Sequence, residues 1–151
     1  MSTNPALRAP TAGERIFNRV FGFLVGLGLA PKDFYLLEVR GRKSGKIYST
    51  PVDLLAVGGR PYLVAPRGRT QWVRNAEAAG EIALKRGGRR QPYRLREVAV
   101  PDRPPVLKAY LDRFQAQVQR FFTVPAGSPA EAFAAVAENY PVFELLSVEN
   151  L

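Results

Sequence analysis

The 151-residue chain contains no histidine and no cysteine, and it has one methionine and one tryptophan. Without the first two residue types, zinc fingers, iron–sulfur clusters, haem held by histidine or cysteine, cysteine nucleophiles and Ser-His-Asp triads are excluded. Disulfides are excluded as well, so stability must come from an apolar core. The chain is 46% hydrophobic and 23% charged, a composition and length that suit one globular domain with such a core.

Long hydrophobic runs are also missing. The apolar run Val20–Ala30 is too short for a membrane span. It follows Arg15 and Arg19, as the core of a signal peptide would, but it ends at Pro31, a poor cleavage context. We therefore expect a helix over about 12–28 that packs on the core of a cytoplasmic protein. An amphipathic helix lying on the inner face of a membrane stays open as the alternative.

What the chain does have is an excess of positive charge, +9 at neutral pH. Residues 40–96 hold 14 basic and 3 acidic side chains, whereas the remainder holds 8 basic and 10 acidic. The positive charge therefore belongs to the middle of the chain. A localised basic region indicates an anionic partner, which leaves nucleic acid, an acidic membrane surface and a phosphorylated small molecule as candidates.

The middle of the chain has the pattern of short strands joined by tight turns. Gly58-Gly59 and Gly87-Gly88 each separate two strand-like segments and predict hairpins. Because no regular helical crossover lies between the strands, an antiparallel sheet or small barrel is favoured. One short helix is expected over Thr70–Ala79, ended by Gly80. The expected strands are 34–40, 49–57, 61–65, 81–85 and 91–100.

The final third is predicted to be mostly helical. Apolar residues at helical spacing follow Pro104 and Pro105 as far as Phe122 and predict one helix. A second helix is expected over Ser128–Glu138, and a last strand at 142–146. With a flexible tail at 1–12, the whole predicts one α+β domain over residues 13–151.

The densest group of cations lies in Arg40–Lys46, a predicted loop between the first two strands. Its glycines permit a tight turn and expose N–H groups, arginine offers a planar fork, lysine a point charge and serine a hydroxyl. Together these groups match a phosphate. The spacing is not that of a Walker loop. From the residues alone, a phosphate site and a charged hairpin facing solvent are equally good interpretations.

A second group of cations lies in 65–75, where a loop leaves the third expected strand and enters the short helix. The N–H groups of this loop and the N-terminus of the helix form a candidate anion site. Trp72 either stacks on a flat ring system or fills the mouth of the barrel, and core packing is the better interpretation of the residue alone. The cations around the second Gly-Gly turn fit a solvated hairpin face: Lys85, Arg86, Arg89, Arg90, Arg94 and Arg96.

An ordered set of motifs makes the chain similar to a known family. It runs GRKSG, STPV, YLVAPRG and QWVRNAEAAG, followed by a Gly-Gly hairpin, and it resembles the deazaflavin-dependent nitroreductase family of actinobacteria from about Asp33 to Val98. The resemblance implies an FMN-binding split-barrel-like fold, a small antiparallel split β-barrel with an N-terminal helix, one short helix between strands and C-terminal helices. It also implies coenzyme F-420, an 8-hydroxy-5-deazaflavin, as the cofactor rather than FMN.

Carried over by position, the resemblance implies that the phosphate and oligoglutamate tail of the coenzyme lie along the basic loops. Trp72 and Asn75 would close the far side of the site. The residues implied at the phosphate are Arg42, Lys43, Ser44 and Gly45; those bordering the ring through their backbone are Thr50, Pro51 and Val52; those wrapping ring and phosphodiester are Val64, Ala65, Pro66, Arg67 and Gly68.

The chain departs from that family in two respects. Many members have a further basic residue three places before the motif proline, where this chain has Tyr48. The loop before Trp72 is also short. We therefore expect rearranged phosphate contacts, in which Lys46 or Arg69 compensates.

The resemblance also implies a mechanism in which the cofactor carries the reactive atom. Reduced deazaflavin delivers a hydride from its C5 carbon to a planar electron acceptor such as a quinone, an enone or a nitroarene, and the proton comes from solvent or a tyrosine. No catalytic side chain is expected, because alignment of donor and acceptor is the main catalytic device. The expected walls of the substrate pocket are Phe17, Phe21, Tyr35 and Tyr48.

Two other functions stay open from the sequence. The first is a non-catalytic barrel that binds a flavin, a lipid or a fatty acid. The second is a nucleic-acid-binding barrel, which would explain the charge but requires exposed aromatics between the cations as stacking platforms. The aromatic residues within 40–96 are few: Tyr48, Tyr62, Trp72 and Tyr93. We therefore expect no nucleic-acid partner. Monomer and homodimer are both compatible with the sequence.

Overall fold

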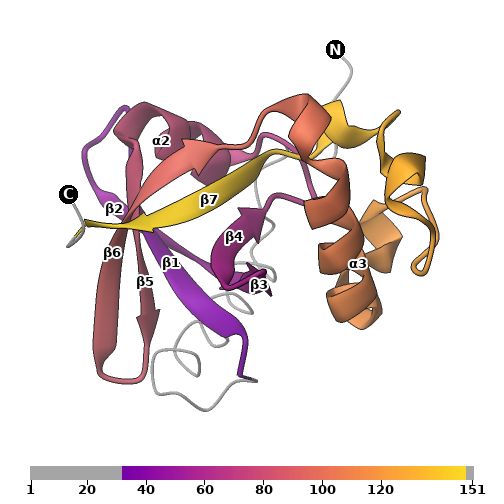
Figure 1. Ribbon diagram of the computed structural model, residues 1–151. Helices are drawn as coiled ribbons and strands as arrows, with labels where there is room; N and C mark the ends of the chain where they lie inside the picture. The colour runs from indigo at the N-terminus through magenta and orange to yellow at the C-terminus, as the bar shows by residue number, and fades with distance from the viewer. Residues whose placement is uncertain (1–31, 149–151) are drawn as a thin grey trace.

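Residues 32–148 are described by the structure, a computed structural model of the chain (Figure 1). Seven antiparallel strands form one sheet in the order β2-β1-β5-β6-β7-β4-β3. The strands are β1 (Phe34–Arg40), β2 (Ile47–Asp53), β3 (Leu55–Val57), β4 (Arg60–Val64), β5 (Glu81–Arg86), β6 (Arg89–Glu97) and β7 (Val142–Ser147).

One short connection accounts for the curl of the sheet. The strands β2 and β3 lie at opposite ends of the hydrogen-bonded order, yet Leu54 is the only residue between them. The sheet must therefore curve until its two ends approach each other, and β2 contacts β4 across the gap. Figure 1 shows the strongly curved sheet that results.

The same connection makes one prediction wrong. The pattern predicts a single strand over 49–57, whereas the structure has two strands there. Leu54 donates its N–H to the carbonyl oxygen of Asp33 at 2.8 Å, and Leu55 then pairs with Tyr62 of β4. The chain thus changes its pairing partner at Leu54, which a local pattern cannot reveal. The other five expected strands and both Gly-Gly hairpins are confirmed.

The interior of the barrel is apolar, and one helix packs against it. This helix, α2 (Gln71–Ala79), confirms the prediction and ends at Gly80, whose φ of +70° is left-handed. Trp72 and Ala76 of α2 pack against buried residues from four strands. Those residues are Leu37, Val39, Leu63, Ile82, Leu84 and Leu145.

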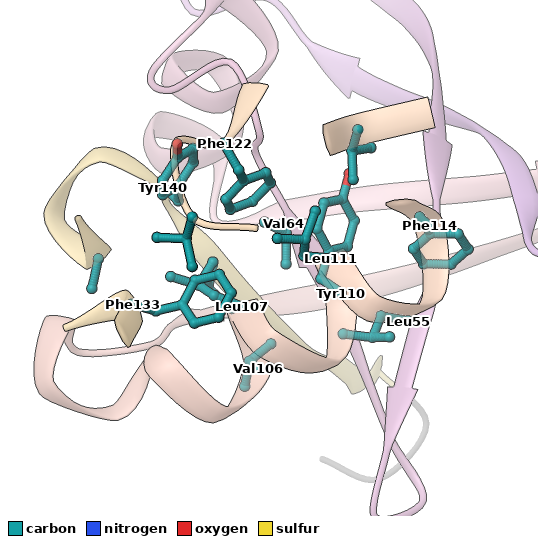
Figure 2. Close-up of a cluster of buried hydrophobic side chains, with 14 residues drawn as sticks. Leu55, Val64, Val106, Leu107, Tyr110, Leu111, Phe114, Phe122, Phe133 and Tyr140 are labelled. Carbon is teal, nitrogen blue, oxygen red and sulfur yellow. The ribbon is translucent and has the colours of Figure 1, made fainter. Parts of the chain in front are cut away.

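A second apolar cluster lies under α3 (Pro104–Val118), as Figure 2 shows. Leu55 of β3 and Val64 of β4 supply the sheet side of this cluster, and Tyr110 and Leu111 lie on the helix side. Leu63 belongs to the interior cluster and Val64 to this one, so adjacent residues of β4 face opposite sides of the sheet. The sheet therefore separates an interior core from a core that α3 covers.

The second helix predicted for the C-terminal third, over Ser128–Glu138, is wrong. That segment forms two 3₁₀ turns, Ala130–Phe133 and Ala137–Asn139. They are held by i to i+3 hydrogen bonds, such as that from the Ala134 N–H to the Glu131 carbonyl at 3.2 Å. The ring of Phe133 is fully buried under α3, and packing of this ring outweighs the helical preference of the surrounding alanines.

The α+β architecture with its antiparallel, barrel-like sheet agrees with the expected fold class. The helix predicted over 12–28 and the tail at 1–12 lie outside the described residues. Within residues 32–148, no helix is both long enough and apolar enough to cross a membrane.

Candidate functional site

The loop between β1 and β2 is fixed to α2 through one arginine. The backbone N–H of Arg42 donates to Oδ1 of Asn75 at 3.1 Å. Its Nη1 donates to the same oxygen at 2.7 Å and to Oε1 of Gln71 at 3.0 Å. Asn75 is only 5% exposed, so its side chain is a buried acceptor that holds the loop. Two regions that the sequence places 33 residues apart therefore form one surface.

The loop itself is shaped by two glycines and a tyrosine. Gly45 has φ of +74°, and its carbonyl oxygen accepts a hydrogen bond from Nη1 of Arg40 at 2.8 Å. The ring of Tyr48 lies against Gly41, where an added Cβ would come within 2.5 Å of the ring carbon Cε2. The hydroxyl of Tyr48 is 3.2 Å from Oγ of Ser44, which also accepts the Lys46 N–H. Tyr48 therefore supports the loop from one side.

Within the described part of the chain, no acid neutralises the lysines of this loop. Lys43 and Lys46 are exposed, and neither has an acidic partner among the residues that the structure describes. Arg69 is different, because Glu77 accepts hydrogen bonds from its Nε and Nη2 at 3.1 and 2.8 Å. Of the two cations expected to compensate for Tyr48, only Lys46 is thus left with an unpaired charge.

The loop that enters α2 lies beside these cations. Gly68 has φ of +80° and donates its N–H to the Ala65 carbonyl at 3.2 Å. Thr70 precedes the helix without a side-chain cap, and the first turn of α2 contains no acidic residue. The amide N–H groups of that turn are therefore not committed to a capping side chain and favour an anion. Arg67 is exposed on this loop, and Pro66 is half-buried.

Three of the implied contact residues have their side chains in the core. Val64 and Ala65 are buried, and the backbone N–H and C=O of Ala65 already bond to Pro141 and Gly68. Trp72 packs against both the interior cluster and Phe143, whose ring centroid is 6.1 Å away. The core-packing interpretation of Trp72 agrees with this position, and the indole remains partly exposed.

Strand β2 is at one end of the hydrogen-bonded order, so one of its edges has no partner strand among the residues that the structure describes. The Leu54 N–H bonds to Asp33, and in the antiparallel register Val52 and Thr50 occupy the same kind of hydrogen-bonded position. The alternate residues Ser49, Pro51 and Asp53 therefore direct their backbone groups away from β1, toward the end of the sheet. The missing N–H of Pro51 fits this arrangement, since proline is tolerated where its nitrogen faces outward from an edge strand.

At the opposite end of the β1–β2 hairpin, two carboxyl groups lie close together. Asp53 and Asp33 line a cavity of about 300 Å³ between the hairpin and α3, together with Arg113. Oδ1 of Asp53 is buried and has no hydrogen-bond partner within residues 32–148. Burial, and secondarily the charge of Asp33, raises the pKa of Asp53 to about 7. Arg113 forms an ion pair with Asp33.

Sequence reasoning missed these acids, although a signal for them exists. Asp33 directly precedes one expected strand, and Asp53 directly follows the STPV motif. Antiparallel pairing across a short loop places such positions side by side, here through the pairing of Phe34 with Asp53.

Of the four expected substrate-pocket residues, the structure describes Tyr35 and Tyr48, which it does not bring together. Tyr35 and Tyr48 share one face of the hairpin but lie at its opposite ends, Tyr35 opposite Val52 and Tyr48 opposite Val39. Tyr35 is half-buried beneath the guanidinium of Arg86, whereas Tyr48 is 51% exposed. Neither lines the cavity beside Asp53. Phe17 and Phe21 lie outside the described residues.

A comparison with protein families gives one match over most of the chain. A family model described as F420H2-dependent quinone reductase matches residues 13–124. No curated protein matches the chain in sequence.

Solved structures share the fold at low sequence identity. One described as an F420-H2 dependent reductase is 21% identical with a TM-score of 0.50, and the match covers 76% of this chain and 94% of that one. A domain-swapped dimer is 21% identical with a TM-score of 0.54, covering 88% and 92%. The haem storage protein HutZ from Vibrio cholerae is 8% identical with a TM-score of 0.53, covering 77% and 82%. At these identities the likeness establishes the fold alone.

Proposed function

The chain belongs to the F420H2-dependent quinone reductase family, and we propose that it transfers a hydride from reduced coenzyme F-420 to a planar electrophile, with quinones as the main class. It is thus an F-420-dependent reductase. The observation that carries the proposal for its site is the cationic loop 41–46, which Asn75 ties to α2 beside the free edge of β2.

The donor set of this region fits the anionic part of the coenzyme. Arg42 uses Nη1 to hold α2, which leaves its Nε and Nη2 without an acceptor in the described residues. Lys43 and Lys46 add two unpaired ammonium groups, and the first turn of α2 adds backbone N–H groups. Guanidinium, ammonium and amide donors on one surface suit a phosphodiester and a chain of carboxylates.

The edge of β2 fits the ring of the coenzyme. Ser49 and Asp53 direct backbone N–H and C=O groups outward and Pro51 directs its C=O, and such groups can pair with the polar rim of a flat heterocycle. The ring position implied by the family at Thr50, Pro51 and Val52 is thus compatible with the register of the sheet.

When bound, the reduced coenzyme supplies the hydride, so this chain needs no nucleophile of its own. The residues of the chain bind and orient: the loop cations hold the tail, and the β2 edge fixes the plane of the ring. Fixed orientation of the two reactants is then the main contribution of the protein to the rate.

A coenzyme titration tests the proposal. We expect purified protein to quench the fluorescence of oxidised coenzyme F-420 at micromolar concentration and to oxidise the reduced coenzyme with menadione. The double substitution Lys43→Ala/Lys46→Ala should weaken coenzyme binding by at least about tenfold. The matched control Lys85→Ala/Arg89→Ala removes the same charge from the β5–β6 hairpin and should change binding little. Equal losses in both variants would contradict the assigned site.

A further inference from the structure

The cavity between the β1–β2 hairpin and α3 is lined by aromatic and by polar side chains. Phe34 and Phe114 provide apolar aromatic surfaces, and the remaining lining is polar. Its volume of about 300 Å³ is at the small end of ligand pockets, enough for one or two fused rings. The six lining residues are Asp33, Phe34, Asp53, Arg113, Phe114 and Gln117.

Asp53 is the group in this cavity that the fold leaves unsatisfied. Its Oδ1 is buried without a hydrogen-bond partner in residues 32–148, although buried polar atoms are normally paired. The ionisable groups facing it are Asp33 from the start of β1 and Arg113 and Tyr110 from α3. Arg113 is already paired with Asp33, and burial raises the pKa of Tyr110, which keeps that phenol neutral. Asp53 is therefore protonated in a large fraction of molecules near neutral pH.

The polar groups of the cavity are mainly hydrogen-bond donors. A protonated Asp53 offers an O–H, Gln117 offers an amide N–H, and Arg113 keeps further guanidinium donors beyond its bond to Asp33. A quinone has two carbonyl acceptors, no donor and a flat ring. Aromatic walls with donors between them match that chemistry.

We propose that this cavity binds the carbonyl end of a quinone acceptor and that Asp53 is the catalytic acid that protonates it. The inference rests on the proposed reductase function and assigns the acceptor to residues other than those expected from the sequence. Asp53 directly follows Val52, the last residue that the family resemblance implies at the ring of the coenzyme, so the cavity would begin one residue from that ring.

The step balances with one proton from Asp53. The quinone receives the hydride with both electrons of the broken C–H bond and becomes a hydroquinone anion. Its oxygen then takes the proton as the Asp53 O–H bond breaks, which completes the hydroquinone. The reduced coenzyme, when bound, would supply the hydride and release the balancing second proton to water, and the Asp53 carboxylate regains its proton from water. A carboxyl group with a pKa near the working pH suits this role.

The test compares Asp53→Asn with wild type in two arms. In the first arm, reduced coenzyme and menadione are mixed in single turnovers across the pH range. We expect the wild-type rate to fall above about pH 7, and we expect Asp53→Asn to lose about 100-fold at low pH and to show no such fall. Coenzyme affinity should stay unchanged in the variant. The control Asp102→Asn, at an exposed position, should behave as wild type.

The second arm measures menadione binding without coenzyme. Wild-type affinity should drop by about threefold to tenfold between pH 5.5 and 8.5, because the neutral acid donates a hydrogen bond that the carboxylate cannot. Asp53→Asn keeps an N–H donor and should bind menadione with no pH dependence. If wild type fails to bind coenzyme, the proposed function fails, whereas this arm still decides the cavity. An unchanged pH profile and rate in Asp53→Asn, or pH-independent menadione binding by wild type, would overturn the inference.

Discussion

The two ends of the β1–β2 hairpin differ in the solvent exposure and the hydrogen bonding of their ionisable side chains. At the loop end, Nη1 of Arg42 donates to the side-chain amides of Asn75 and Gln71, while the lysines beside it are exposed and have no acidic partner among the described residues. At the other end, Asp53 is half-buried, its buried Oδ1 has no hydrogen-bond partner within residues 32–148, and its pKa is raised. The loop cations are thus charged and exposed to solvent, whereas burial favours the neutral, protonated form of Asp53. The first arrangement suits binding of an anion, and the second suits proton transfer.

The largest expected effect is at the loop end, where Asn75→Leu removes the shared acceptor. Arg42 then loses two hydrogen bonds, one of them from its backbone, in a half-buried position. We expect a loss of about 2–3 kcal/mol in the free energy of unfolding, measured in urea, and weaker coenzyme binding. Asn75→Asp keeps an acceptor oxygen opposite Arg42 and should retain coenzyme binding. Loss of affinity in both variants alike would show that α2 does not position the loop.

A substitution at the acidic end should have a smaller effect on the free energy of unfolding, and one of the opposite sign. The pKa of Asp53 in the folded state, about 7, lies above its ordinary value, so the stability due to its protonated form is fully present below about pH 4 and is lost as the pH rises through 7. Asp53→Asn is neutral throughout and should therefore raise the free energy of unfolding by about 1–2 kcal/mol at pH 8, after allowance for solvent screening, and by less at pH 5. Urea unfolding at both pH values measures it. An equal gain in the free energy of unfolding at pH 5 and pH 8 would mean that Asp53 is ionised at both pH values, which would contradict its raised pKa.

The two ends of the hairpin also differ in how well the sequence predicts them. The strands and the helix α2 were predictable because alternation, Gly-Gly turns and Gly80 are local signals. The division of the expected strand 49–57 at Leu54 could not be predicted, because it depends on how the two ends of the sheet approach each other. The loop cations were found as a group, because they are adjacent in the chain. Asp33 and Asp53 were missed because they meet only through the register of the β1–β2 hairpin. Arg113 was missed because it comes from a helix 80 residues after Asp33, and only tertiary packing joins the two.

The smallest expected effect separates two cations near the loop. Lys46 has no acidic partner in the described residues, so its full charge is available to a bound anion, whereas Arg69 already donates two hydrogen bonds to Glu77. Lys46→Ala should weaken coenzyme binding by about threefold to fivefold, and Arg69→Ala by less than about twofold. Titration at low salt is the appropriate measurement, because added salt screens exposed charges and should narrow the gap. If Arg69→Ala has the larger effect, the coenzyme tail displaces Glu77, and the anion site extends along α2 rather than along β2.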